Sequence, residues 1–247
     1  MVHLGPLPGA PEFPGDLEAL VAAARADAQA LAAAGFGGVV VENFGDAPFF
    51  ADDVPDVTVA AMTRAVGAVI EAAAIPVGVN VLRNDALAAL AIAAATGASF
   101  IRVNVLSGTM YTDQGPIIGN AARVARARAE LCPEVTVLAD VFVKHATPPP
   151  GLTLESAALD LADRGGADAV VVSGTGTGSP LDIRELRRVR TAIELPVLAG
   201  SGVTPETVAE ILSIADGVIV GSALKVGGKA TSPVDPARAA DFVAAAG

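Results

Sequence analysis

Few residues of this chain can carry acid–base or nucleophilic chemistry, and most of them follow directly on short apolar runs. The 247 residues include three lysines, two histidines and one tyrosine, and most of the positive charge is arginine. Lys144 and His145 follow the run VTVLADVFV, His3 follows the first two residues, and Tyr111 lies in a long loop between two runs. A desolvated lysine can form a Schiff base, and a histidine or carboxyl group can transfer protons. These residues therefore indicate either lyase or aldolase chemistry, or acid–base chemistry such as isomerisation or glycosidic cleavage.

Carboxyl, amide and guanidinium groups stand at the ends of other apolar runs. Glu42 closes GVVVE, and Arg102 alternates with Asn104 in IRVNV. Alternate residues of a strand point to the same face, so Arg102 and Asn104 are predicted to point into the same interior. A buried arginine requires an acidic partner, which Glu42 or Asp140 can supply; the alternative is an ion pair that only fills the interior. The candidate catalytic residues are Glu42, Arg102, Asn104, Asp140, Lys144 and His145.

Three glycine-rich turns end apolar runs further along the chain. In LAGSGVTPE, a helix start is predicted after the glycines, with Thr204 as its cap and Pro205 in its first turn. Glycines let an anion approach the backbone, serine hydroxyls add donors, and a helix start favours negative charge. SGTGTG lacks the GK[ST] ending of a nucleotide P-loop and the GxGxxG spacing, which excludes both. The predicted phosphate-binding residues are Gly174, Thr175, Gly176, Gly200, Ser201, Gly202, Gly221 and Ser222.

The elements that position these residues repeat one pattern, a β-branched run followed by a loop and an Ala-rich helix. Predicted strands are Val2–Leu4, Gly38–Glu42, Pro76–Val81, Phe100–Val105, Val135–Val141, Ala169–Ser173, Pro196–Ala199 and Gly217–Val220. Predicted helices include Leu17–Ala34, Asp56–Ala74, Asp85–Thr96, Leu154–Arg164, Asp182–Ile193 and Pro205–Ile214. Runs such as VVV do not alternate, which is typical of strands covered on both faces. Strand–helix alternation implies parallel strands with right-handed crossovers.

Eight such units predict an α/β fold, namely a single (β/α)8 TIM barrel that forms one domain over residues 1–247. The alternative is a doubly wound open sheet. In such barrels the chemistry lies in the loops at the carboxyl ends of the strands. This rule places all the residues named above on one face, together with Lys225 and Lys229 after the eighth strand.

Composition excludes several classes of function. The net charge of −11 argues against nucleic acid as a partner, because phosphate backbones repel an acidic surface. The single Cys132 permits no internal disulfide and favours the cytoplasm, and the start MVHLGPLPG does not resemble a signal peptide. The apolar runs are too short and interrupted for a membrane span. No cofactor is indicated; Mg²⁺ on carboxylate oxygens is compatible with the residues, but no ligand pattern indicates it. Exposed Ala- and Val-rich helices are compatible with a homo-oligomer.

Long motifs along nearly the whole chain resemble a known family. VHLGPLPGAP, VENFGDAPF, GVNVLRND, FIRVNVLSG, TDQGPIIG, LADVFVKHA, VVSGTGTG, LAGSGVTPE and VGSALK together resemble the BtpA/SgcQ family. The GSG turn followed one helix later by ADGVIVGSALK is similar to the phosphate-binding half of tryptophan-synthase-α-type and related ribulose-phosphate-binding barrels. Motif positions outside the catalytic set are identified as candidate substrate-binding residues: His3, Asn43, Asp46, Asn80, Asp113 and Gln114. This chain lacks the usual lead-in to the first strand, and it has VFVKHA where relatives tend to have VHVKHA.

Two functions follow from the residues and the resemblance. The first is an enzyme that acts on a small phosphorylated sugar or nucleoside-related metabolite, as a lyase, isomerase or nucleosidase. Acid–base chemistry is favoured over a Schiff base, because Lys144 lies some way past its strand end. The second is a non-catalytic binding or assembly factor, since cyanobacterial members of the family are associated with photosystem I biogenesis. The polar strand ends favour the enzyme, because a scaffold has no need of them.

Overall fold

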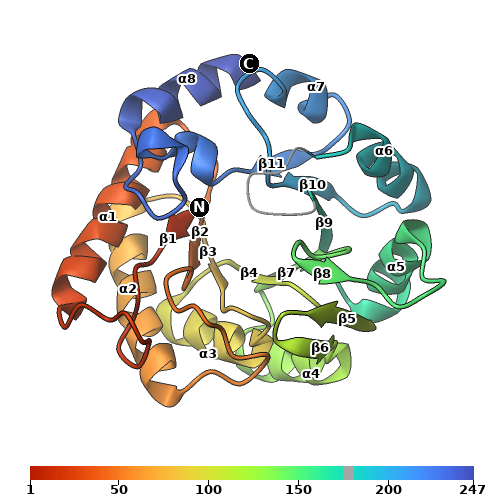
Figure 1. The fold of residues 1–247 in the computed structure, drawn as a ribbon, viewed down its shortest axis with the longest axis horizontal. Helices are drawn as coiled ribbons and strands as arrows, with labels where there is room; N and C mark the ends of the chain where they lie inside the picture. Colours follow the sequence, from red (N-terminus) through yellow and green to blue (C-terminus); the bar gives the residue numbers. More distant parts are fainter. Residues whose placement is uncertain (175–180) are drawn as a thin grey trace.

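A curled sheet of eight parallel strands forms the centre of the computed structural model, which describes residues 1–174 and 181–247 (Figure 1). The strands are β1 (Val2–His3), β2 (Val39–Glu42), β3 (Val77–Asn80), β4 (Phe100–Val103), β7 (Thr136–Asp140), β9 (Ala169–Ser173), β10 (Val197–Gly200) and β11 (Gly217–Ile219). They lie side by side in this order, which is also their order along the chain. A doubly wound sheet would reverse its strand order at a switch point. The predicted α/β barrel is therefore confirmed.

The first and last strands meet through one backbone contact. The Met1 amino group donates a hydrogen bond of 2.8 Å to the carbonyl oxygen of Val220. Strand β1 pairs on its other side with β2, where His3 stands opposite Glu42. This register places a histidine and a glutamate side by side at the carboxyl ends of two neighbouring strands.

Helices surround the sheet (Figure 1). They are α1 (Leu17–Ala34), α2 (Asp56–Ala73), α3 (Ala86–Thr96), α4 (Ala121–Leu131), α5 (Leu154–Asp160), α6 (Ile183–Ala192), α7 (Val208–Leu212) and α8 (Pro236–Ala246). Carboxylate caps begin several of them: Asp16 accepts from the Ala19 amide, and Asp85 accepts from the Ala88 amide. Such caps satisfy backbone donors that a helix start leaves unpaired.

Two helices differ from the prediction. The segment predicted as one helix over Leu154–Arg164 ends its α-helical part at Asp160 and continues as a π-helical turn over Leu161–Gly165. The helix predicted from Pro205 begins at Val208, so Thr204 is not its cap. The Thr207 hydroxyl accepts from the Thr204 amide at 3.0 Å, and this local turn takes the place of the first helical residues.

Strand residues alternate between the helices and the barrel interior. Outward residues such as Val41, Val79 and Val172 belong to the main apolar core shared with the helices. Inside, a lower apolar layer is built from Leu138, Ala169 and Val171, with Phe100, Leu198 and Ile219 packed against it. Phe100 needs a glycine beside it, because a Cβ on Gly78 would lie 2.1 Å from its ring.

The sequence did not predict a second, three-stranded antiparallel sheet formed by the loops after β4 and β7. Its strands are β5 (Thr109–Thr112), β6 (Gly115–Ile118) and β8 (Ala146–Thr147), in the order β6-β5-β8. Val105, Met110, Ile117 and Val143 form a small separate core with it. The long loop that was expected to hold Tyr111 is therefore a hairpin with its own packing.

Candidate functional site

The upper layer of the barrel interior is polar, and an ion pair forms its floor. Arg102 donates from Nε and Nη2 to the two carboxylate oxygens of Asp140, both at 2.8 Å, and the two side chains are 3% and 0% exposed. Paired geometry of this kind is the strongest arrangement for a buried guanidinium. Asp140 is the acidic partner that the sequence required. Both carboxylate oxygens of Asp140 thus accept a hydrogen bond from the Arg102 guanidinium.

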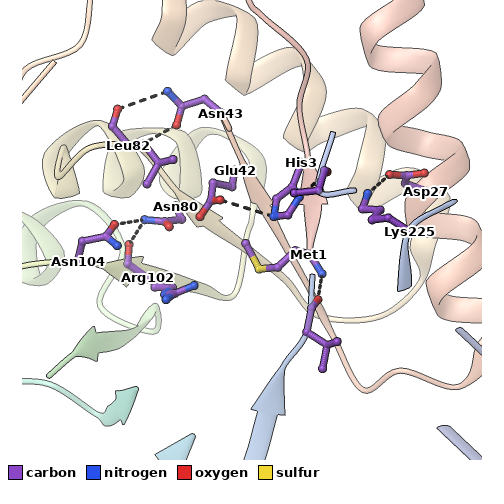
Figure 2. Close-up of polar contacts among 12 residues, drawn as sticks. Met1, His3, Asp27, Glu42, Asn43, Asn80, Leu82, Arg102, Asn104 and Lys225 are labelled. Carbon is purple, nitrogen blue, oxygen red and sulfur yellow. Dashed lines mark hydrogen bonds and ion pairs between the residues drawn. The ribbon is translucent and has the colours of Figure 1, made fainter. Parts of the chain in front are cut away.

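Amide groups complete this layer. Asn80 donates from Nδ2 to the Arg102 carbonyl oxygen and to Oδ1 of Asn104, each at 3.0 Å (Figure 2). Oδ1 of Asn80 and the hydroxyl of Ser173 are two of the three buried side-chain atoms without a hydrogen-bond partner among the described residues; the third is Oε1 of Gln114. Asn80 and Asn104 thus hold neighbouring strands together beneath the barrel mouth.

A cavity of about 160 Å³ opens at the carboxyl ends of the strands. Its lining includes groups that can exchange charge and protons, His3, Glu42, Arg102 and Lys144. The turns after β10 and β11 also line it, through Ser201, Gly202, Val203, Thr204, Gly221, Ser222 and Ala223. One space therefore joins the predicted reacting groups to part of the predicted phosphate turns.

His3 and Glu42 face each other in the wall of this cavity (Figure 2). His3 Nε2 lies 3.7 Å from Oε1 of Glu42, and Nδ1 lies 2.8 Å from the Ala230 carbonyl oxygen. The imidazole stacks on Phe44, with ring centroids 4.6 Å apart. Burial lowers the pKa of His3 to about 4, although the charge of Glu42 opposes the shift. The imidazole is therefore neutral at pH 7.

Lys144 enters the cavity from the loop between β7 and β8. The Arg83 guanidinium donates to the Lys144 carbonyl oxygen at 2.5 Å and so fixes the backbone of that loop. Burial lowers the pKa of the Lys144 ammonium, and the charges of Arg102 and Arg83 act in the same direction while Glu42 opposes them. A lysine with a lowered pKa can give up its proton more readily than an exposed one.

The turn after β10 shows a distinct role for each of its three residues. Gly200 lies in the barrel interior, where a Cβ would come within 2.6 Å of Val171, and the cavity lining of the described residues does not include it. Ser201 has a left-handed backbone with φ 89°, which is strained for a residue with a side chain. Its hydroxyl oxygen accepts from the Gly174 amide at 3.2 Å, so that amide is already engaged. Gly202 also has positive φ, 67°, and lines the cavity.

The segment after β11 is anchored from behind. Gly221 leaves room for the His3 ring, since a Cβ there would lie 3.1 Å from its Cε1 atom. Lys225, which was expected on the face that carries the chemistry, is instead 1% exposed and pairs with Asp27 in the middle of α1 at 2.5 Å (Figure 2). Asp27 also accepts from the Val234 amide at 2.7 Å. A buried ion pair thus secures the loop that carries Gly221.

Other predicted site residues lie away from the cavity. Asn43 and Asp46 hydrogen-bond to each other, and Asn43 also bonds the Leu82 backbone; both line a separate groove. Asp113 and Gln114 form the tip of the β5–β6 hairpin. His145 is exposed, and the cavity lining of the described residues does not include it. Thr175 and Gly176 fall outside the described residues.

Sequence reasoning did not name eight of the lining residues, which are Met1, Phe44, Val203, Thr204, Ile219, Val220, Ala223 and Gly228. Phe44 directly follows the motif residues Glu42 and Asn43, and that position was the available signal. Gly228 is brought in by the loop after β11, which no local pattern predicts. Within the described part of the chain, no cluster of three or more potential metal ligands occurs. Residues 1–174 and 181–247 contain no helix long and apolar enough to cross a membrane.

A parallel α/β barrel with a small polar cavity at the carboxyl ends of its strands is an architecture shared by many enzymes of small metabolites. The chain belongs to the BtpA family, which matches residues 1–247. It is 46% identical over 246 residues to the photosystem I biogenesis protein BtpA of Synechocystis sp., covering 99% of this chain and 86% of that protein. The family resemblance drawn from the motifs is thereby confirmed.

Solved structures with low sequence identity share the fold. Thiamine phosphate pyrophosphorylase from Pyrococcus furiosus matches with a TM-score of 0.60 and 14% identity, covering 93% of this chain and 90% of that chain. Orotidine 5′-phosphate decarboxylase from Pyrococcus horikoshii OT3 matches with a TM-score of 0.59 and 14% identity, covering 100% and 99%. At these identities the likeness concerns the fold alone.

Proposed function

We propose that this chain is an enzyme that acts on a small phosphorylated metabolite, within one domain over residues 1–247 and in the cytoplasm. The observation that carries the proposal is that one cavity is lined both by Glu42 and Lys144 and by the turns at Ser201–Gly202 and Gly221-Ser222. The substrate phosphate binds at the turns, and the reacting end lies against Glu42 and Lys144.

Electrostatics support an anionic substrate. Two cationic side chains, Arg102 and Lys144, line a cavity in which Glu42 is the one carboxylate among the described lining residues. Asp140 neutralises Arg102 in part, whereas no hydrogen bond or ion pair to the Lys144 ammonium is found among the described residues. An unpaired, partly buried cation favours a bound anion. The two solved barrels named above act, by their names, on phosphorylated compounds, which agrees with this assignment.

The chemistry proposed for the reacting end is proton transfer. Lys144, with its lowered pKa, and Glu42 are two titratable groups that line the same cavity, as acid–base catalysis requires. Schiff-base formation at Lys144 is the second option, because burial also makes its amine a better nucleophile. Asp140 acts through Arg102 as a positioning residue.

A thermal-shift experiment tests the phosphate site. Inorganic phosphate, sugar phosphates and nucleotides are each added with and without Mg²⁺, and a ligand at about 100 times its Kd stabilises the folded chain by about 2.7 kcal/mol. The variant Gly202→Asp places a carboxylate at the proposed phosphate position and is expected to abolish the shift. Gly227→Asp is the matched control, because Gly227 has nearly the same backbone, φ 65° against 67°, and is exposed. A shift that persists in Gly202→Asp places the anion elsewhere.

A binding or assembly factor is the second candidate function. Two observations favour it: the name of the Synechocystis relative, and an apolar groove of about 360 Å³ between the β1–α1 and β2–α2 loops. Pro11, Pro48 and Phe49 line this groove with Phe50, which is 57% exposed. Exposed apolar surface of this kind often marks protein contacts. This function takes precedence if no phosphate compound shifts the melting temperature.

A further inference from the structure

The pair of His3 and Glu42 has a property that the phosphate site does not explain. The Ala230 carbonyl oxygen can only accept a hydrogen bond, so Nδ1 of His3 carries the hydrogen and Nε2 keeps its lone pair. Nε2 and Oε1 of Glu42 are therefore two acceptors that face each other at 3.7 Å, beyond hydrogen-bond distance. Neither can satisfy the other.

This arrangement is held in place from several sides. Strand register sets His3 opposite Glu42, and Phe44 stacks on the imidazole at 4.6 Å. Gly221 gives the ring its space from the far side. The low pKa of His3, about 4, keeps the ring neutral at physiological pH. The two acceptors are thus preorganised and do not result from a mobile side chain.

Two adjacent acceptors call for two adjacent donors. A divalent cation or a substrate ammonium would also be attracted to Glu42, but Arg102 and Lys144 line the same cavity and repel added positive charge. Hydroxyl groups are neutral donors, so Arg102 and Lys144 do not repel them. Two hydroxyls on neighbouring carbons can reach two acceptors that lie side by side, one hydroxyl to each.

We infer that His3 and Glu42 form a subsite for a vicinal diol, and that the substrate is a phosphorylated sugar or polyol with two adjacent free hydroxyl groups. This inference rests on the proposed function, since the phosphate turns that line the same cavity set the position of the diol. A cavity of about 160 Å³ that holds both ends limits the substrate to a short carbon chain or a single ring. The subsite therefore binds hydroxylated compounds more tightly than their deoxy counterparts.

Matched pairs of phosphorylated compounds test this inference by calorimetric titration. Ribose 5-phosphate is compared with 2-deoxyribose 5-phosphate, and glycerol 3-phosphate with 3-hydroxypropyl phosphate, while inorganic phosphate reports on the anion site alone. In at least one pair the diol is expected to bind about tenfold or more tightly than its deoxy partner, because hydrogen bonds to a charged group are strong.

Two variants link that preference to the subsite. Glu42→Gln removes the charge at nearly constant shape, and His3→Phe keeps the ring stack while it removes the Nε2 lone pair. Both are expected to reduce the diol preference to about onefold while inorganic phosphate still binds. Glu71→Gln, on an exposed position of α2, is the control and should keep the preference.

The outcomes separate the two proposals. Equal affinity for both members of every pair, with phosphate still bound, overturns the diol subsite and leaves the proposed function standing. A diol preference that survives in both Glu42→Gln and His3→Phe also overturns it, because the diol then binds elsewhere. If neither inorganic phosphate nor any phosphorylated compound binds, the proposed function fails and the subsite fails with it.

Discussion

Replacing Asp140 with asparagine should strongly destabilise the barrel. The change leaves the Arg102 guanidinium buried at 3% side-chain exposure, without the carboxylate that now binds it twice at 2.8 Å. Removing one partner of a buried pair costs about 3–5 kcal/mol, because the remaining charge stays desolvated. For a chain of this size that cost lowers the melting temperature by roughly 6–20 °C. Urea unfolding of the wild type and Asp140→Asn measures the free energy of unfolding directly.

A second variant distinguishes a lost ion pair from general disruption. Replacing both partners, as in Arg102→Met with Asp140→Leu, removes the uncompensated charge and should recover most of the stability lost in Asp140→Asn. Glu155→Gln breaks the exposed pair with Arg188 and should leave the melting temperature unchanged. If Asp140→Asn loses less than about 1 kcal/mol, the guanidinium has access to water and the buried-pair reasoning is refuted.

Three further predictions concern single positions. Gly78→Ala should lower the free energy of unfolding by about 1–3 kcal/mol or more, because the added methyl group overpacks against the Phe100 ring. Chemical denaturation of Gly78→Ala, alone and combined with Phe100→Leu, checks whether the smaller side chain at position 100 restores stability. Ser201→Ala should be less stable than Ser201→Gly by about 1 kcal/mol. Both variants lose the hydrogen bond from the Gly174 amide, but only glycine relieves the backbone strain at φ 89°. Equal melting temperatures for the two variants would argue against strain. Because of His3, the free energy of unfolding of the wild type should fall by roughly 3 kcal/mol between pH 7 and pH 4. Burial lowers the pKa of His3 in the folded chain to about 4, so the unfolded chain takes up a proton that the folded chain excludes. His3→Phe lacks this loss, so the difference in stability between wild type and variant should change by roughly 3 kcal/mol over this pH range, and parallel curves would contradict the assignment.

The repeated pattern of apolar runs, loops and helices was sufficient to predict the barrel, because the runs and their alternation with helices can both be read from short stretches of sequence. Runs such as Val39–Val41 have no polar face, so they must be covered on both sides, and their alternation with Ala-rich helices allows few topologies. The rule that loops after strands carry the site then brought His3, Glu42 and Lys144 to one cavity.

What the sequence could not reveal depends on contacts between distant segments. Lys225 had the appearance of a reactive residue, and only the packing of α1 shows that Asp27 neutralises it. The sequence also did not indicate that Gly200 is packed closely against Val171 of the neighbouring strand, 2.6 Å from where a Cβ would lie. The antiparallel strands β5, β6 and β8 pair across loops separated in sequence, so no local periodicity announces them.

The central claim is that the turns after β10 and β11 hold a phosphate in the same cavity as Glu42 and Lys144. A crystal structure of the chain with inorganic phosphate tests it most directly. The claim predicts a tetrahedral anion between Ser201–Gly202 and Gly221-Ser222, within reach of the Lys144 ammonium. An anion bound at any other position, or a cavity that holds only water at saturating phosphate, would contradict it.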